Sequence, residues 1–332
     1  MRVPYEEMHR ELTRILTEHG METERARLSA KLFTDASRDG IYSHGLNRFP
    51  LFVRAVELGD VDVNAKATLA AGMGVMEQWD GNHGPGNLNA YQCMQRTIDL
   101  ARTHGLGMVG LRNTNHWMRP GNYGLMAAEA GCIGMLWTNT VPNMPPWGGR
   151  DAKLGNNPLV IAIPNGEEPV LLDIAMSMFA YGKLDSYARQ GRELPVDGGF
   201  NKQQQLTRNA AEIVETQQAL PFGFWKGSGL SLALDLMAAA ISGGRTAREV
   251  GERLRETEVS QVFLAIDVEQ MPNRGQFVQQ VRETLTDLQA SAPMQDNKPP
   301  TYPGQNMMRT RRDSLQNGIP VEEVVWNEVK TL

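Results

Sequence analysis

The 332-residue sequence contains only two cysteines and no strong excess of charge of either sign. Cys93 and Cys132 form neither a C-x-x-C pair nor a disulfide framework, so the sequence is typical of a reducing compartment and predicts a cytoplasmic protein. Lys and Arg number 33 against 38 Asp and Glu, which gives a net charge of −5. Because the basic residues form no clustered stripe, the sequence argues against a nucleic-acid partner.

Long hydrophobic runs and several common catalytic motifs are also missing. The N-terminal segment has no apolar signal core, and the apolar stretch SLALDLMAAAISG is interrupted by Asp235 and is shorter than a membrane span. We therefore expect neither an export signal nor a membrane partner. The sequence has no G-x-S-x-G, H-E-x-x-H, P-loop or EF-hand pattern, which argues against the common hydrolases, zinc proteases, NTPases and calcium-binding proteins.

What the sequence does contain is a regular alternation of helical and strand patterns. Two amphipathic helices are expected over residues 5–20 and 22–39. From about residue 90 to 245, helical segments alternate with apolar strands such as CIGMLWTN, NPLVIAIP and PVLLDIA, and a further apolar strand, QVFLAIDV, follows. This alternation predicts an α/β fold around a sheet, with domain boundaries near residues 75 and 240.

The stretch GLGMVG, which begins at Gly105, matches the dinucleotide-binding pattern G-x-G-x-x-G. That pattern binds pyrophosphate only where it follows a strand and opens a helix, because the ligand needs the free N–H groups of the first helical turn. Here a helical pattern, AYQCMQRTIDLARTH, comes first and a strand pattern follows. We therefore interpret Gly105, Gly107 and Gly110 as part of a helix-to-strand turn, not as a cofactor site.

Three histidines lie in turns rich in glycine and polar residues: His44 in YSHGLNR, His83 in GNHGPGN and His116 in TNHWMRPGN. Functional groups concentrate in such loops. His44 stands out because Arg48 follows four residues later, and in a helical turn the two side chains share a face. An imidazole exchanges protons near neutral pH, and a guanidinium binds a carboxylate through two hydrogen bonds. The alternative is a helix capped by Ser43 with a surface histidine and arginine.

The segment FGFWKGSGLSLALDLM is a second candidate site, since a glycine-rich turn opens a helix there. The free N–H groups, the helix dipole and Lys226 would converge on an anion, while Trp225 would pack on a flat ring. The alternative is a flexible loop capped by Ser228, and the spacing fits both equally.

The segments YSHGLNRFP, RNTNHWMRPGNYG, NPLVIAIP, LLDIAMS, LPVDGGF and PFGFWKGSGLSLALDL occur in this order between about residues 3 and 330. Together they resemble the type 2 malate/L-lactate dehydrogenase family of NAD(P)-dependent oxidoreductases. The resemblance implies an α/β fold with a non-Rossmann mixed-sheet cofactor domain over 76–240. It also implies an outer domain built from both chain ends, 1–75 and 241–332, and a homodimer with sites near the subunit interface.

The resemblance further implies a site for NADH. The residues that it assigns to the cofactor are Pro169, Val170, Leu171, Leu172, Asp173, Ile174, Ala175, Trp225, Lys226, Gly304, Gln305 and Asn306. NADH is expected over NADPH, because Asp173 ends a strand segment without arginine, so a 2′-phosphate there would lack a cation. Two positions depart from many relatives: Asn156 stands in place of threonine, and Gln305 in place of an acidic residue.

The implied reaction is reduction of the keto group of a 2-oxo sugar acid. By resemblance, His44 is the proton donor. We further expect Arg48 to anchor or polarise the 2-oxo acid, and His116 to line the pocket with Asn115. No metal is expected, because imidazolium and guanidinium groups stabilise the developing charge. Alternatives are a dehydrogenase of malate, lactate or ureidoglycolate, and an imino-acid reductase. A non-catalytic anion-binding or scaffold protein is a further alternative, but it would have no reason to keep His44 with Arg48.

Overall fold

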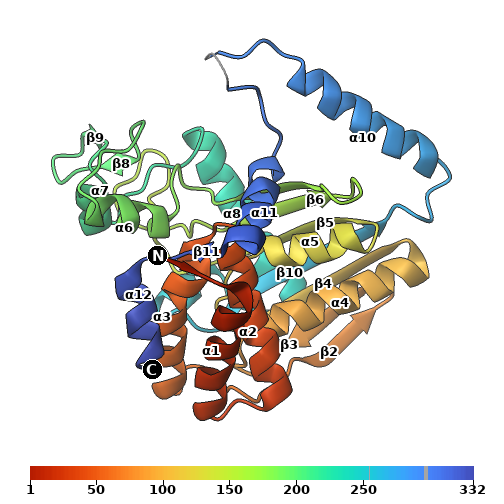
Figure 1. Cartoon of the computed structure of the whole chain (residues 1–332), viewed down its shortest axis with the longest axis horizontal. Helices are drawn as coiled ribbons and strands as arrows, with labels where there is room; N and C mark the ends of the chain where they lie inside the picture. The colour runs from red at the N-terminus through yellow and green to blue at the C-terminus, as the bar shows by residue number, and fades with distance from the viewer. Residues whose placement is uncertain (254, 295–297) are drawn as a thin grey trace.

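The computed structural model describes residues 1–253, 255–294 and 298–332, and its centre is one seven-stranded sheet (Figure 1). In order across the sheet, the strands are β2 (Thr68–Met73), β3 (Met76–Asp80), β4 (Leu106–Thr114), β10 (Val259–Asp267), β5 (Cys132–Thr138), β6 (Leu159–Ile163) and β7 (Val170–Ile174). β3 and β4 run parallel, and the other neighbouring pairs in this sheet are antiparallel. This order confirms the predicted non-Rossmann mixed sheet.

The glycine-rich stretch follows a helix and is not the start of one, as predicted, but only its first residue lies between the helix and the strand. Helix α4 (Gly86–His104) ends at Gly105, which adopts a left-handed φ of +82°, and β4 follows. Gly107 and Gly110 lie within β4, where neighbouring backbone comes very close. A Cβ on Gly107 would lie 2.2 Å from the Thr97 carbonyl oxygen, and one on Gly110 would lie 2.6 Å from that of Ile241. These glycines therefore let helices pack on the sheet.

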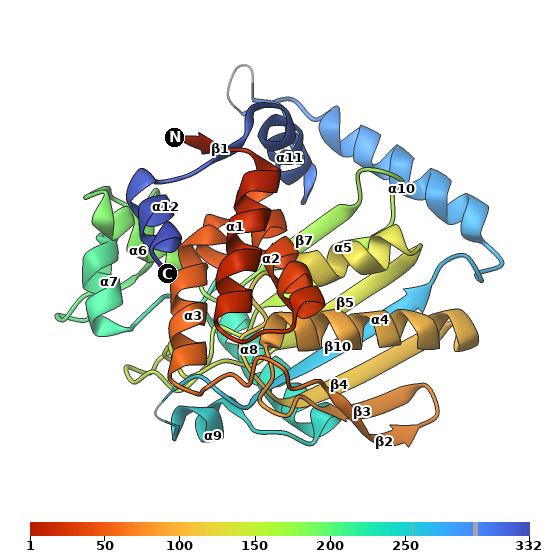
Figure 2. The same ribbon diagram turned by 60° about the horizontal axis from the view of Figure 1, so that its bottom comes forward.

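Helices cover both faces of the sheet (Figure 2). α4 and α5 (Gly121–Glu129) pack on one face, and α8 (Trp225–Ser242) packs on the other. Consecutive residues of β10 show why, because side chains alternate across a strand. Phe263 belongs to the core beneath α4 and α5, whereas Val262 belongs to the core beneath α8.

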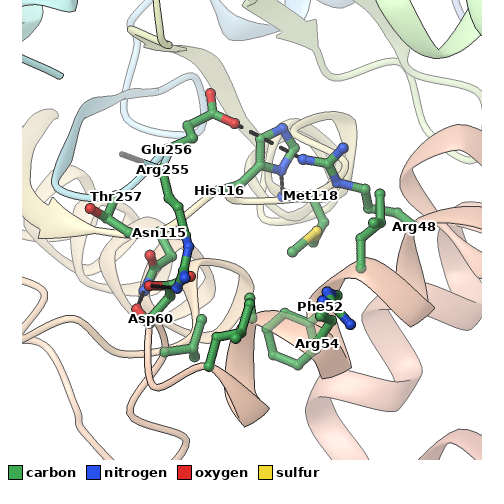
Figure 3. A pocket seen from close by; sticks show the side chains of 14 residues that line it. Arg48, Phe52, Arg54, Asp60, Asn115, His116, Met118, Arg255, Glu256 and Thr257 are labelled. Atoms are coloured by element: carbon green, nitrogen blue, oxygen red, sulfur yellow. Dashed lines mark hydrogen bonds and ion pairs between the residues drawn. The ribbon is translucent and has the colours of Figure 1, made fainter. Parts of the chain in front are cut away.

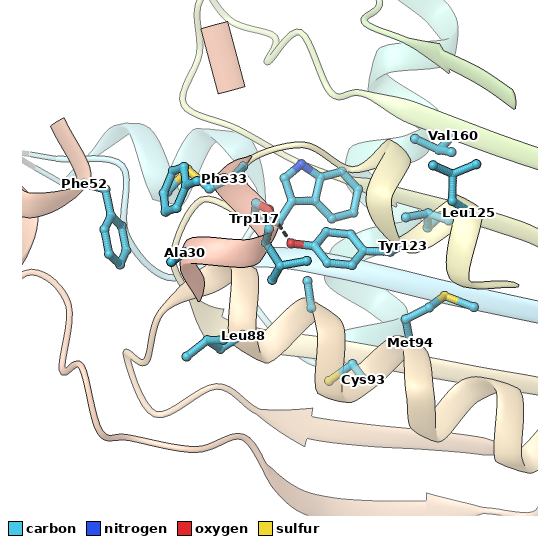
Figure 4. Packing of buried hydrophobic residues seen from close by; sticks show 14 of the residues in the cluster. Ala30, Phe33, Phe52, Leu88, Cys93, Met94, Trp117, Tyr123, Leu125 and Val160 are labelled. Atoms are coloured by element: carbon cyan, nitrogen blue, oxygen red, sulfur yellow. Dashed lines mark hydrogen bonds between the residues drawn. The ribbon is translucent and has the colours of Figure 1, made fainter. Parts of the chain in front are cut away.

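The larger core joins the sheet to the N-terminal helices (Figure 4). Trp117, Tyr123 and Phe263 form its aromatic centre, with ring centroids 6.1 to 6.4 Å apart. The Tyr123 hydroxyl donates a hydrogen bond to the Trp117 carbonyl at 2.6 Å, so this phenol is buried with its polar atom satisfied. The residues just after β4 are thereby fixed against α5, and among them is His116.

The two ends of the chain lie together beside this core (Figure 1). Strand β1 (Arg2–Val3) pairs with β11 (Ile319–Pro320). The surrounding helices are α1 (Tyr5–Glu18), α2 (Thr23–Arg38), α3 (Phe49–Glu57), α11 (Gln305–Asn317) and α12 (Glu323–Lys330). The first two match the helices predicted over 5–20 and 22–39. The sheet itself takes β2 from before residue 76 and β10 from after residue 240, and the domain boundaries stay a prediction.

A small lobe projects from the sheet domain, on the left in Figure 1. It consists of β8 (Gly199–Phe200), β9 (Leu206–Thr207), α6 (Tyr181–Arg189) and α7 (Ala210–Thr216), around a core that includes Leu184, Leu194 and Ile213. The remaining helices are the short α9 (Ala247–Gly251) and α10 (Arg274–Gln289), which extends away from the rest of the chain. Within the described ranges, no helix is long and apolar enough to span a membrane.

Candidate active site

His44 and Arg48 lie on two short 3-10 helices, η1 (Tyr42–His44) and η2 (Leu46–Arg48). Gly45 separates the two helices, and a Cβ at this position would lie 2.2 Å from the Ser37 hydroxyl oxygen. Ser43 caps neither helix, and its hydroxyl lies 3.0 Å from His44 Nδ1. The single helical turn predicted here and its alternative, a Ser43 cap, are both wrong. His44 and Arg48 are nonetheless close enough for the arginine charge to act on the imidazole.

The structure brings His116 to His44 although 72 residues separate them. Their rings are nearly parallel, at 20°, with centroids 5.7 Å apart. His116 Nδ1 accepts a hydrogen bond from the Met118 N–H at 3.0 Å, so a neutral His116 carries its proton on Nε2. The backbone after β4 thus fixes the orientation of His116, on which the His44 ring stacks.

Both imidazoles favour the neutral form. Burial, with the positive charges of Arg48 and Arg119, lowers the pKa of His44 to about 4. Burial also holds the pKa of His116 well below its usual value, and Arg48 and His44 act in the same direction. At neutral pH the free protein therefore presents two uncharged rings beside a guanidinium.

A cavity of about 230 Å³ opens next to this group (Figure 3). Its volume is below the roughly 300–1,000 Å³ of sites for drug-sized ligands, so it suits a smaller molecule. The lining residues are Arg48, Leu51, Phe52, Arg54, Ala55, Leu58, Asp60, Val61, Asn115, His116, Met118, Arg255, Glu256 and Thr257. His44 is not in this lining and contacts it through the His116 ring. Asn115 is there, but its side-chain amide donates to the carbonyls of Asp60, His83 and Gly84 and so braces the surrounding loops.

The segment before β10 supplies cavity residues that the sequence did not indicate. Arg255 forms an ion pair with Asp60 through two contacts of 2.7 Å. Glu256 is half-buried and places Oε2 4.0 Å from the Arg48 guanidinium. Its carboxylate also accepts a hydrogen bond from the Val141 N–H. No motif surrounds these residues, and only the fold brings them to α3.

Two of the predicted cofactor segments meet at β7. The Leu171 N–H donates a hydrogen bond to the Pro303 carbonyl at 3.0 Å. Gly304 follows with a left-handed φ of +93°, and a Cβ there would lie 3.0 Å from Leu171 N and 3.1 Å from the Pro169 carbonyl oxygen. Glycine is therefore required at this contact for both its conformation and its size.

Asp173, in the same strand, is an exposed residue, but burial of its carboxyl group raises the pKa of that group, against the opposing effects of Arg119 and the Gly121 N–H. Its Oδ2 accepts a hydrogen bond from the Gly121 N–H at 3.1 Å. The buried Arg119 lies nearby and pairs with Asp39. Arg119 Nε and Gln305 Oε1 are buried and have no hydrogen-bond partner among the described residues. An unsatisfied Arg119 donor near the Asp173 carboxyl, and an unsatisfied Gln305 acceptor directly after Gly304, fit a polar ligand with hydroxyl and phosphate groups.

The start of α8 lies just beyond β7, since the Phe222 N–H donates to the Met176 carbonyl at 2.9 Å. The anion site predicted there stays a prediction, with fewer donors than expected, because the N–H groups of Gly227 and Ser228 already donate to the carbonyls of Phe222 and Phe224. The alternative Ser228 cap is wrong, because its hydroxyl accepts from the Trp147 N–H. Trp225 itself is 65% exposed and Lys226 is exposed beside it, so both are accessible to a ligand or partner.

Comparison with known proteins agrees with this architecture. Residues 3–330 match the model of the malate/L-lactate dehydrogenase family. The chain is 40% identical to the 2,3-diketo-L-gulonate reductases of Citrobacter koseri and Escherichia coli O6:K15:H31, over the full length of both partners.

Solved structures extend the similarity. A malate dehydrogenase from Entamoeba histolytica is 25% identical with a TM-score of 0.95, covering 100% of this chain and 96% of that one. Sulfolactate dehydrogenase from Methanocaldococcus jannaschii is 28% identical with a TM-score of 0.90, covering 100% and 96%. The chain therefore belongs to the malate/L-lactate dehydrogenase family and is an oxidoreductase that acts on CH–OH groups.

Proposed function

We propose that this chain reduces the keto group of a 2-oxo sugar acid, with 2,3-diketo-L-gulonate as substrate and 3-dehydro-L-gulonate as product, using NADH. The observation that carries the proposal is the small cavity in which Arg48 and His116 lie beside each other, with His44 stacked behind. The names of the 40%-identical relatives support this substrate over other 2-oxo acids.

Arg48 and His116 in the cavity, together with His44 stacked on His116, divide the chemistry between them. The planar guanidinium of Arg48 binds the substrate carboxylate and draws electron density from the adjacent carbonyl. NADH, when bound, is the source of the hydride that the carbonyl carbon receives. Protonated His44 then gives its proton to the alkoxide oxygen, which leaves a hydroxyl group and a neutral imidazole. His116, a partly exposed residue of the cavity lining, would donate a hydrogen bond from Nε2–H to the substrate.

The proposed cofactor site follows β7. Three observations support it: the contact of Gly304 with Leu171, the Asp173 residue at the surface, and the Gln305 Oε1 without a hydrogen-bond partner. Asp173 favours NADH, because a carboxylate accepts hydrogen bonds from ribose hydroxyls and repels a 2′-phosphate. The buried Arg119 is a cation close to Asp173, and it shares the Asp39 carboxylate with Arg38 and Arg311, so the preference for NADH rests on Asp173 alone.

We also propose that the chain forms a homodimer. Helix α8 buries one face against the sheet but leaves Leu232, Leu236 and Met237 between 44% and 54% exposed. Helix α10 likewise carries a stripe that includes Phe277 and Val281 but has no fully buried residue. Exposed or partly exposed apolar faces on two helices are typical of surfaces that a second subunit covers.

A panel of 2-oxo acids tests the function. Purified protein is given NADH or NADPH with diketogulonate, oxaloacetate, pyruvate, or a cyclic imino acid, and the loss of reduced-nicotinamide absorbance is followed. We expect the highest kcat/KM with diketogulonate and NADH. Faster reduction of another acid would replace the proposed substrate, while no oxidation of NADH or NADPH with any acid would overturn the reaction itself.

A further inference from the structure

The charges inside the cavity nearly balance one another. Arg255 is neutralised by Asp60 through its two 2.7 Å contacts, and Arg54 is exposed on α3. The charge that remains beside the histidines is that of Arg48, and Glu256 faces it at 4.0 Å. Figure 3 shows the Glu256 carboxylate directed toward the guanidinium next to the His116 ring.

Glu256 therefore lies close to Arg48, the residue that would bind the carboxylate of a substrate. Only 22% of the Glu256 side chain is exposed. Burial raises the pKa of its carboxyl, although Arg48 and the Val141 N–H act in the opposite direction. A carboxyl group has more acceptor sites than these two neighbours use, so Glu256 can also accept a hydrogen bond from a ligand in the cavity.

We propose that Glu256 is a specificity-determining residue, which accepts a hydrogen bond from a hydroxyl group of the substrate and excludes substrates with a second carboxylate. This inference rests on the proposed reduction of 2-oxo acids. A substrate held by Arg48 presents its next carbon atoms, each about 1.5 Å further along the chain, to a side chain only 4.0 Å from that arginine. A hydroxyl group at this distance is a donor for Glu256, whereas a carboxylate would meet a like charge.

Three short 2-oxo acids isolate the two effects. Pyruvate has neither extra group, hydroxypyruvate adds a hydroxyl, and oxaloacetate adds a carboxylate. In the wild type we expect kcat/KM, relative to pyruvate, to be raised for hydroxypyruvate and lowered for oxaloacetate.

Two substitutions separate charge from hydrogen bonding. Glu256→Gln keeps the acceptor oxygen and removes the charge, so relative kcat/KM for oxaloacetate should rise about tenfold or more while hydroxypyruvate changes little. Glu256→Leu removes the acceptor as well, so relative kcat/KM for hydroxypyruvate should fall by about tenfold or more. Glu252→Gln is the matched control, since this exposed glutamate pairs with Arg248 outside the cavity.

Binding without turnover gives an independent readout. Calorimetric titration of the cofactor-free protein with glycerate and malate should show that Glu256→Gln gains affinity for malate by a similar factor and keeps its affinity for glycerate. Circular dichroism checks that each variant is folded. If Glu256→Leu does not fold, the results for Glu256→Gln alone decide the proposal.

The two proposals fail in different ways. If the wild type reduces none of the three acids and diketogulonate also fails, the proposed function is overturned, and the titrations still decide the role of Glu256. If the wild type reduces them but Glu256→Gln leaves both ratios and both affinities unchanged, the role of Glu256 is overturned while the function stands.

Discussion

At the scale of single residues, the site combines one permanent charge with two rings that resist protonation. Arg48 serves a carboxylate well, but the same charge lowers the pKa of both His44 and His116. A proton donor with a pKa of about 4 is protonated in only about one molecule in a thousand at pH 7. Binding of an anionic substrate to Arg48 offsets this charge and favours protonation of His44.

The low pKa of His44 predicts a distinct pH dependence. If His44 is the proposed proton donor, reduction needs its protonated ring, and kcat/KM should fall about tenfold for each pH unit above about 4, across the range 5 to 8. Oxidation of the hydroxy acid requires the neutral ring, so its kcat/KM should stay nearly constant over that range. Initial rates in both directions at saturating cofactor check this. A reduction rate that is flat or rises with pH would assign the proton to another group.

Replacement of His44 tests the same role by another route. His44→Asn should bind NADH normally but lose roughly 10² to 10⁴ in kcat, because the proton donor is removed. Fluorescence titration with NADH and single-turnover rates measure the two quantities. His83→Asn is the control, since His83 is an exposed turn residue with φ of +56°, a conformation that asparagine also adopts. Equal loss in both variants would argue against a special role for His44.

At the scale of elements, β7 is where three distant parts of the chain meet. Its residues contact the Pro303–Gly304 turn and the start of α5, and the chain that follows it contacts the start of α8. The strand β7 was predictable from its apolar run, and the helices α5 and α8 from the helical patterns in the sequence. The contacts were not, because they depend on close backbone approaches that leave no sequence pattern beyond a glycine. Glu256 was missed for the same reason, since it lies outside any motif.

Gly304→Ala tests whether this meeting point binds the cofactor. The Cβ would lie 3.0 Å from Leu171 N in a left-handed conformation, so we expect a loss of about 1–3 kcal/mol of stability and at least tenfold weaker NADH binding. Gly20→Ala is the control, because Gly20 has a similar φ of +85° but no atom within 4 Å of the added Cβ. Thermal unfolding and NADH titration compare the two. Unchanged NADH affinity in a folded Gly304→Ala variant would place the cofactor elsewhere.

Predictability also differed among the elements. The strands β4 to β7 and β10 were visible as apolar runs. β2 was not, because all six of its residues are exposed at the edge of the sheet and show no alternation. Helix α11 was missed because its sequence is largely polar, with Ser314 as its single fully buried residue.

At the scale of the whole molecule, the exposed face of α8 predicts the state of association. Light scattering at micromolar concentration should give about twice the chain mass of 36.8 kDa. Leu236→Lys should shift the protein toward monomer, because covering one leucine contributes about 1.5–3 kcal/mol per subunit and a buried lysine adds a desolvation cost. Val324→Lys, at a 79% exposed position of α12, should leave the mass unchanged. A monomeric wild type with full activity would contradict the predicted dimer.

The position of β10 has a consequence for how the protein is made. β4 and β5 follow each other in the chain, yet β10 separates them in the sheet and pairs with both. During synthesis the ribosome must therefore add more than 120 residues after β5 before the central strand exists. Until then, β4 and β5 each have an edge of unpaired backbone groups, which invites pairing with other chains. We infer that the nascent chain depends on chaperones, or on rapid completion, to avoid aggregation during this interval.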